Sequence, residues 1–254
     1  MTNDKPFSER QEFLGIHFDM ISANFLMESI LTRNPNASFE YVVTPNVDHI
    51  VKLHQRASRL DLPYHDAAFT ICDSRILPLL ARINGIRIPV IPGSDLTARL
   101  FQDVIAPDDP VTIVGSGPEE IERLKCRYGL KRVRHHSPPM NLVNDPVAVQ
   151  NVVEFIVSSP ARYIFLALGS PQQEVIAHQI WLTGEGRGLG FCVGASIDFL
   201  TGKATRAPRF VQRLRLEWLY RLIKEPGRLW RRYLIDDIRI LAIYWRWLLN
   251  RKSK

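Results

Sequence analysis

The sequence predicts an α/β protein built on a Rossmann-like, doubly wound and mostly parallel sheet. Four largely apolar runs rich in strand-forming residues support this prediction: 67–72, 111–115, 163–168 and 189–194. Such runs are typical of strands that are covered on both faces, as in a parallel sheet. Because helical patterns lie between the strands at a regular pitch, we expect helices on both sides of one sheet.

The other predicted elements complete this alternation. They are a weak strand at 13–18, a helix at 22–32, a strand at 39–44, a strand at 131–135 and a helix at 146–157. A chain of 254 residues is long enough to bury a full core, either as one large domain or as one domain with an appendage.

Positive charge is concentrated near the end of the chain. Residues 206–254 hold 14 Lys and Arg against 4 Asp and Glu, a net of +10, whereas residues 1–205 hold 19 against 22, a net of −3. We therefore predict an α/β core at 1–205 and a basic, amphipathic helical appendage at 206–254. A basic appendage favours an anionic partner, either nucleic acid or a membrane surface.

The last predicted helix, 234–249, is apolar on two sides. One side carries Leu234, Ile238, Leu241, Trp245 and Leu248, and the other carries Ile240, Ile243, Tyr244 and Trp247. Charged residues interrupt the run, so it is too short and too charged to span a bilayer. Trp, Tyr and Arg side chains at helical spacing suit the plane of a membrane interface and favour a membrane over nucleic acid. Packing on the core or on a second subunit is an equal alternative.

The three cysteines, Cys72, Cys126 and Cys192, favour a reduced environment. They lie far apart, show no metal-ligand spacing and are odd in number, so we expect no disulfide framework. The first residues contain no apolar signal region. We therefore expect a cytoplasmic protein without a metal site.

Polar side chains follow two predicted strands at their carboxyl ends, where open α/β sheets bind ligands. Thr44 and Asn46 end the strand at 39–44, and Asn46 also suits the N-cap of the next helix. Asp73 follows the strand at 67–72. The local pattern favours a helix cap for Asp73, but the same position suits a general base in a partly desolvated crevice.

Two glycines mark the end of the strand at 111–115. The backbone amides around Gly115 and Gly117 could hold a phosphate at the start of the next helix. No third glycine follows at the spacing of a dinucleotide-binding fingerprint, so nicotinamide binding is a weak expectation. A nucleotide-binding, Rossmann-like protein is therefore a second hypothesis, and a non-catalytic adaptor at a membrane surface is a third.

The segment that follows the strand at 163–168 is polar. Gly169 allows the chain to turn, and Ser170 and Pro171 predict a capped helix with proline in its first position. The next three side chains, 172–174, are Gln, Gln and Glu, which an ordinary helix start does not require. We expect them to form one wall of a ligand crevice.

Seven segments occur in the order expected of one enzyme family. They are Thr44-Pro-Asn46, Cys72-Asp-Ser74, Gly93-Ser-Asp-Leu96, Leu168-Gly-Ser-Pro-Gln-Gln-Glu174, Val193-Gly194 with Asp198 to Gly202, Arg206-Ala-Pro208 and Glu217-Trp-Leu-Tyr-Arg-Leu-Ile-Lys-Glu-Pro-Gly-Arg228. Through them the chain resembles the WecG/TagA/CpsF glycosyltransferases, glycosyltransferase family 26, over roughly residues 12–233.

The resemblance implies an inverting, metal-independent hexosyltransferase without a cofactor. Such an enzyme moves a sugar, of the N-acetylmannosamine type or glucose, from a UDP-sugar to a polyprenyl-diphosphate-linked saccharide in bacterial cell-surface or exopolysaccharide synthesis. The acceptor lies in the cytoplasmic leaflet, whose anionic headgroups attract Lys and Arg. The resemblance therefore implies a peripheral protein on the inner face of the plasma membrane, with no nucleic-acid partner. A homo-oligomer is left open.

The resemblance also assigns roles to individual residues. It makes Asp73 the catalytic base that accepts the proton of the acceptor hydroxyl. Positive charge or aligned amides, with Arg206 as a candidate, would stabilise the leaving diphosphate. The full set of expected substrate-binding residues is Thr44, Asn46, Gly115, Gly117, Gly169, Gln173, Asp198 and Arg206.

Three positions depart from the family pattern. Ser74 replaces a glycine, and Gln172 replaces a lysine. Pro89-Val90-Ile91 stands where the family has Glu-Arg-Val, so an arginine of its active site has no direct equivalent. Arg87 is the nearest arginine in the same loop. These changes leave the reaction class intact and affect the expected sugar specificity.

Overall fold

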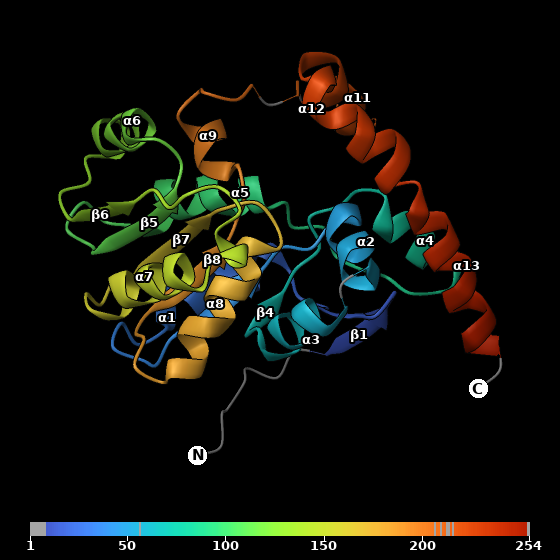
Figure 1. Ribbon diagram of the computed structural model, residues 1–254, viewed down its shortest axis with the longest axis horizontal. Helices are drawn as coiled ribbons and strands as arrows, with labels where there is room; N and C mark the ends of the chain where they lie inside the picture. The colour runs from blue at the N-terminus through green and yellow to red at the C-terminus, as the bar shows by residue number, and fades with distance from the viewer. Residues whose placement is uncertain are drawn as a thin grey trace.

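The computed structural model in Figure 1 describes residues 9–55, 57–205, 207, 208, 210, 211, 214 and 216–252. Within these residues it contains a six-stranded sheet with the order β4-β3-β8-β7-β5-β6, in which every pair of neighbours is parallel. The strands are β3 (Glu40–Val43), β4 (Phe69–Thr70), β5 (Val111–Gly115), β6 (Val133–His136), β7 (Tyr163–Ala167) and β8 (Leu189–Cys192). The predicted parallel α/β fold is confirmed.

Helices cover both faces of the sheet. They are α1 (Ala23–Thr32), α2 (Val47–Gln55), α3 (Ala57–Asp66), α4 (Leu77–Ile83), α5 (Gly93–Arg99), the π-helix η1 (Leu100–Val104), α6 (Pro118–Tyr128), the 3₁₀ helix η2 (Leu142–Asn144), α7 (Pro146–Val157), α8 (Gln172–Thr183) and α9 (Ser196–Leu200). Successive residues of a strand point to opposite faces. Accordingly, Ile164 packs with α2, α7 and α8 in one core cluster, and Phe165 packs with α1, α5 and α6 in the other.

The first predicted strand, 13–18, is a hairpin instead of one strand. Strands β1 (Arg10–Phe13) and β2 (Ile16–Asp19) pair antiparallel in a sheet of their own. Leu14 and Gly15 form the turn with φ values of 55° and 84°, and the glycine adopts this left-handed conformation without strain. The alternation in this segment was too weak to reveal the turn.

The predicted start of the helix after β7 is also displaced. The helix α8 begins at Gln172, and Pro171 occupies the N-cap position instead of the first helical position. The Ser170–Pro171 peptide bond is cis. The predicted strand before this turn and the predicted helices at 22–32 and 146–157 are confirmed by β7, α1 and α7.

The C-terminal helices lie beside the edge of the sheet that carries β4. They are α11 (Glu217–Lys224), α12 (Pro226–Arg231), the π-helix η3 (Arg232–Asp236) and α13 (Arg239–Lys252). Figure 1 shows α13 running past α2 and α4, at the opposite end of the molecule from α6 and β6. Phe13 contacts both Tyr244 and Trp247, with ring centroids 6.4 Å and 5.1 Å apart. The body of α13 is therefore packed on the N-terminal hairpin and α2.

Only one of the two apolar sides of α13 is covered. Ile240, Ile243 and Tyr244 are buried against the core. On the other side Leu241 and Trp245 are 53% and 65% exposed. One apolar side of α13 thus packs on the core, which is one of the two expected arrangements. The other apolar side is exposed and available for a partner. Within the described residues, none of the helices has the length and apolar character needed to cross a bilayer.

Candidate active site at the carboxyl edge of the sheet

The parallel sheet brings most of the expected site residues to one edge. In the order of the strands, Asp73 follows β4, Thr44 and Asn46 follow β3, Asp198 lies in α9 after β8, and Gly169 follows β7. Gly115 is the last residue of β5, and Gly117 follows it. Arg206, the ninth expected residue, lies outside the described residues. From β5 the chain continues to β6 on one side of the β5–β7 pair, and from β7 it continues to β8 on the other side. The crevice between β5 and β7 is therefore a topological switch point.

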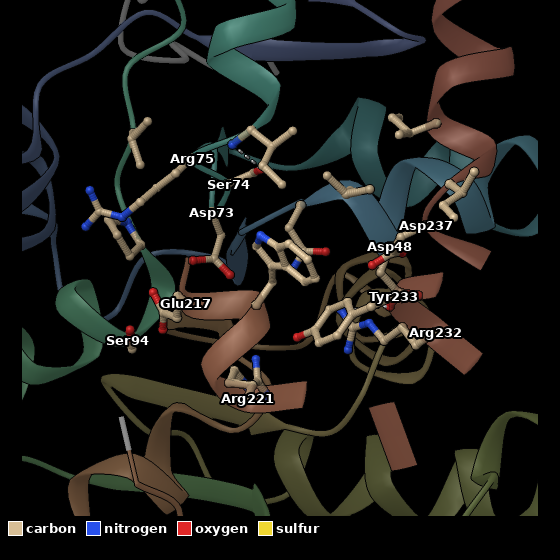
Figure 2. Close-up of a pocket in the computed structure, with 18 of the residues that line it drawn as sticks. Asp48, Asp73, Ser74, Arg75, Ser94, Glu217, Arg221, Arg232, Tyr233 and Asp237 are labelled. Carbon is tan, nitrogen blue, oxygen red and sulfur yellow. Dashed lines mark hydrogen bonds and ion pairs between the residues drawn. The ribbon is translucent and has the colours of Figure 1, made fainter. Parts of the chain in front are cut away.

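A cavity of about 360 Å³ lies at the β3–β4 end of this edge, beneath the C-terminal helices. Its lining includes Asn46, Asp73, Arg75, Glu217, Trp218 and Arg221. In Figure 2, Asp73, Arg75 and Glu217 occupy one side of the view, and Arg232 and Asp237 occupy the other. The cavity is therefore formed jointly by the strand ends and by α11, η3 and α13. Among the expected residues, Asp73 and Asn46 line it.

Asp73 lines this cavity and does not cap α4, the helix that follows it. Its Oδ1 accepts a hydrogen bond from the backbone N–H of Gly93 at 3.0 Å, and the Asn46 side-chain amide donates to the same carboxyl group. The cap for α4 is supplied by Ser74, whose Oγ accepts from the N–H groups of Ile76 and Leu77, both at 3.2 Å. The interpretation of Asp73 as the cap of the helix that follows it is therefore wrong; its carboxylate instead accepts from Gly93, the first residue of α5.

The environment of Asp73 raises its pKa to about 6. Burial is the largest cause, and the negative charge of Glu217 adds to it. The Gly93 N–H, His49 and Asn46 act in the opposite direction but do not outweigh burial. A carboxyl group with such a pKa is a stronger base than an ordinary aspartate and is still ionised at neutral pH, as a general base requires.

A buried polar network lies directly beneath the cavity. The Nδ1 atom of His49 is 2.8 Å from Oδ1 of Asn46, and its Nε2 atom is 3.3 Å from Oε1 of Glu174. Gln173 donates to Glu174 at 2.8 Å and accepts from the N–H of Gly194 at 2.8 Å. The network joins Asp73 to the end of β8 through Asn46, and thereby holds the Asn46 amide in position.

Burial would by itself raise the pKa of Glu174, whose side chain is completely inaccessible. Hydrogen bonding and charge from His49, together with the hydrogen bond from Gln173, reverse this effect and hold the pKa below its usual value. Glu174 is therefore an ionised group of the interior, and its neighbours compensate for its desolvation.

Two expected pocket residues thus lie under the cavity and not in its wall. Gln173 is 2% exposed and uses its amide within the network. Thr44 is 4% exposed, and its hydroxyl donates to the carbonyl of Cys192 at 2.8 Å. A Cβ atom at Gly93 would lie 3.2 Å from Oγ of Thr44, so the loop above β3 is tightly packed.

The glycines lie along the same edge but away from the cavity. Gly115 has a φ of 96°, and a Cβ atom there would lie 2.4 Å from the carbonyl oxygen of Ala167, so only glycine fits beside β7. At Gly117, a Cβ atom would approach Oε2 of Glu120, which ion-pairs with Lys203 at 3.3 Å. The start of α6 therefore already holds a carboxylate within reach of the expected phosphate position.

Asp198 and Gly169 are more open than these glycines. Asp198 lies in α9, and its Oδ1 atom is buried without a hydrogen-bond partner. A Cβ atom at Gly169 would meet no atom within 4 Å. Gly169 follows β7, which borders the switch point, whereas Asp198 follows β8, the next strand in the sheet. A ligand at the switch point could reach the unpartnered oxygen of Asp198.

Sequence patterns did not single out several cavity residues. Glu217 and Arg221 are four residues apart, so they lie on one side of α11. Their segment was interpreted as amphipathic and as part of the family resemblance, but neither side chain was assigned to the site. Arg75 lines the cavity from the turn before α4, whereas Arg87 is exposed and is not among the lining residues. His49 lies three residues after Asn46, and this helical spacing was the available signal for their contact.

The described residues contain no group of three His, Cys, Asp or Glu side chains that could hold a metal ion. The chain as a whole was compared with models of known protein families. Residues 11–254 match the model described as the glycosyl transferase WecG/TagA/CpsF family. Because this match covers nearly the whole sequence, the chain belongs to the WecG/TagA/CpsF family of glycosyltransferases.

Proposed function

We propose that this enzyme is an inverting, metal-independent hexosyltransferase that moves a sugar from a UDP-sugar to a polyprenyl-diphosphate-linked saccharide. The observation that carries the proposal is the Asp73 carboxyl group, which lines a cavity beside two arginines and has a pKa raised to about 6. The transferred sugar is of the N-acetylmannosamine type or glucose. Its product would enter a bacterial cell-surface polymer or exopolysaccharide.

The reaction is a single displacement at the anomeric carbon. Asp73 accepts the proton of the acceptor hydroxyl as that oxygen bonds to the anomeric carbon from the side opposite UDP. The bond between the anomeric carbon and the UDP oxygen breaks, and the diphosphate leaves with the electron pair. Arg75 and Arg221 line the same cavity and are the cations that stabilise the developing negative charge. Inversion follows from attack on the face opposite the leaving group.

The donor lies along the carboxyl edge of the sheet. Its nucleotide occupies the switch point between β5 and β7, near Gly115, Gly117, Gly169 and Asp198, and its sugar extends towards Asp73. Because the Glu120 carboxylate accepts from the backbone of Gly117, the phosphates lie on the Gly169 side of this crevice. The unpartnered Asp198 oxygen would accept a hydrogen bond from the donor. Thr44 and Gln173 support this site from below through their contacts with the end of β8.

A donor panel tests the proposed reaction. Purified protein is incubated with a lipid-diphosphate acceptor and a series of UDP-sugars, and UDP release and product mass are measured together. We expect one hexose donor to give acceptor-dependent UDP release and a product that is heavier by one hexosyl unit with inverted anomeric configuration. UDP release with every donor and no glycosylated lipid would contradict the proposal.

The C-terminal region would hold the enzyme against the membrane that contains its acceptor. We divide the chain into a core at 1–205 and a basic appendage at 206–254, with the division resting on the charge distribution. Exposed apolar side chains of the appendage, of α4 and of its N-cap residue border this region: Ile76, Leu79, Ile83, Leu241, Trp245 and Leu249. Basic side chains nearby would interact with anionic headgroups at the inner face of the plasma membrane.

Replacing Trp245 and Leu249 with glutamate should weaken binding to vesicles containing phosphatidylglycerol by at least about tenfold, because burying one such side chain contributes roughly 1.5–3 kcal/mol. Sedimentation at low salt measures the bound fraction. Leu182→Glu is a matched control, since Leu182 is 56% exposed but lies on α8. Equal loss of binding in the control would show that the exposed side of α13 is not the membrane contact.

A further inference from the structure

The end of the cavity farthest from Asp73 contains a second group of polar side chains. Asp48 contributes from α2, Arg232 and Tyr233 from η3, and Asp237 from the turn before α13. Figure 2 shows these four residues together on the side of the cavity opposite Asp73. The proposed transfer reaction does not use them, and no sequence pattern indicated them.

Two ion pairs fix the position of Asp48. Its Oδ2 atom is 2.7 Å from Nζ of Lys52 and 3.3 Å from Nη2 of Arg232. Burial would raise the pKa of Asp48, but Arg232 and Lys52 outweigh it and hold the pKa below its usual value. Lys52 also donates to the carbonyl of Ser170 at 2.8 Å. Asp48 is thus an ionised anchor for the Arg232 side chain.

Two polar atoms of this group are buried without a partner. They are Nε of Arg232, a donor, and Oδ1 of Asp237, an acceptor. Leaving a buried donor or acceptor unsatisfied is costly, so such atoms beside a cavity indicate a missing ligand group. A donor and an acceptor that are free together match a hydroxyl group, which both accepts and donates, or two neighbouring hydroxyls.

The balance of charge argues against a phosphate at this end. Two carboxylates, Asp48 and Asp237, stand beside two cations, Lys52 and Arg232, and burial with repulsion from Asp48 raises the pKa of Asp237 to about 6. An anionic ligand would meet both carboxylates, which like-charge repulsion disfavours. A neutral polar ligand meets no such penalty.

The same end offers aromatic and aliphatic surface. The rings of Trp218 and Tyr233 lie edge to face, with centroids 6.2 Å apart and an interplanar angle of 74°. Ile238 and Leu241 add aliphatic contacts to the lining. A site that combines apolar surface with a few polar groups suits a ligand that has both apolar faces and hydroxyl groups at its edge.

From these contacts we infer that the Arg232–Asp237 end of the cavity binds a neutral sugar ring of the acceptor, through ring hydroxyls that accept from Nε of Arg232 and donate to Oδ1 of Asp237. The inference rests on the proposed transferase function, in which Asp73 accepts the proton of the acceptor hydroxyl. The acceptor hydroxyl then meets Asp73 while the rest of its saccharide occupies this end. The acceptor diphosphate lies outside the Arg232–Asp237 group.

Two soluble probes separate sugar recognition from diphosphate recognition. One is a short-chain prenyl diphosphate carrying a single N-acetylglucosamine, and the other is the same prenyl diphosphate without a sugar. Calorimetry in the presence of UDP gives the dissociation constant of each probe. Steady-state transfer gives KM for the sugar-bearing probe and for the UDP-sugar.

Asp237→Ala should raise the dissociation constant and KM of the sugar-bearing probe by about 10- to 100-fold, as expected for loss of a hydrogen bond to a charged group. Asp237→Asn keeps an acceptor oxygen and should show a smaller increase. Arg232→Lys keeps a cation beside Asp48 but removes the Nε donor, so it should resemble Asp237→Ala. Donor KM and binding of the sugar-free probe should not change. Asp236→Asn, one residue away and outside the cavity lining, is the matched control.

The outcomes separate this inference from the function on which it rests. If the wild-type enzyme transfers sugar and Asp237→Ala leaves acceptor binding unchanged, the sugar site is refuted and the transferase function stands. Equal losses for both probes would assign this end to the diphosphate and also refute the inference. If the wild-type protein transfers nothing but binds only the sugar-bearing probe in an Asp237-dependent way, the proposed reaction fails and the sugar site stands.

Discussion

Asp73→Asn should lower kcat for sugar transfer by about 10²- to 10⁴-fold, the usual contribution of a general base. Asparagine has nearly the same shape and can still accept the hydrogen bond from Gly93, but it cannot take the proton of the acceptor hydroxyl. The KM of the UDP-sugar should change little, because Asp73 is at the acceptor side of the proposed reaction. Steady-state kinetics with saturating acceptor measures both constants.

The pH profile provides the control for this prediction. Wild-type kcat/KM should fall about tenfold per pH unit below about 6, since the base must be deprotonated and burial raises its pKa to about 6. Glu217→Gln removes a negative charge that raises the Asp73 pKa, so it should move this limb to lower pH. In Asp73→Asn the acidic fall in kcat/KM should disappear. If kcat/KM of Asp73→Asn still fell at the same pH as in the wild type, the base would be another group.

Glu174→Ala should lower the free energy of unfolding by about 3–5 kcal/mol, the range found when one partner of a buried charged pair is removed. The change leaves Nε2 of Gln173 and the ring of His49 without their carboxylate in the interior. Since His49 also contacts Asn46, activity should fall as the Asn46 amide loses its position beside Asp73. Denaturant unfolding measures the first effect, and sugar transfer measures the second.

Two further variants test whether the Glu174 carboxylate stabilises the fold. Glu174→Gln keeps the acceptor for Gln173 but not the charge, so it should cost less than Glu174→Ala. Glu154→Ala, at an exposed glutamate of α7, should change stability by no more than about 0.5 kcal/mol. Because the Glu174 pKa is lowered in the folded state, the stabilisation from its charge is present above the unfolded pKa near 4.3 and is lost as pH falls through the folded value. An alanine variant as stable as the control would contradict a stabilising role.

The sequence alone was sufficient to predict a parallel sheet covered by helices and to predict the edge of that sheet at which the candidate site lies. Apolar runs such as 163–168 and the helical pattern at 146–157 are local signals, and they appear in the structure as β7 and α7. Parallel strands all end at one edge, so the order of polar residues after each strand placed Asp73 and Asn46 near each other. Asp73 could be assigned a role only through the family resemblance, because its local pattern favoured a cap.

Tertiary structure alone decided which side chains meet in the cavity. Gln173 follows β7 in the expected place, yet its side chain turns inward to Glu174 and Gly194. Glu217 and Arg221 reach the cavity from a helix far along the chain, by contacts that no local pattern encodes. Orientation and long-range packing depend on the complete core, whereas local periodicity reports only how each segment folds by itself.

The last helix illustrates the same division. Its sequence determined an amphipathic, basic segment with apolar residues on two sides and too much charge to span a bilayer. The structure buries the side with Ile243 and Tyr244, because Phe13 of the N-terminal hairpin and α2 offer it a complementary surface. The side with Trp245 stays exposed. Two apolar sides of similar strength are equivalent in the sequence, and only the surface presented by the rest of the chain distinguishes them.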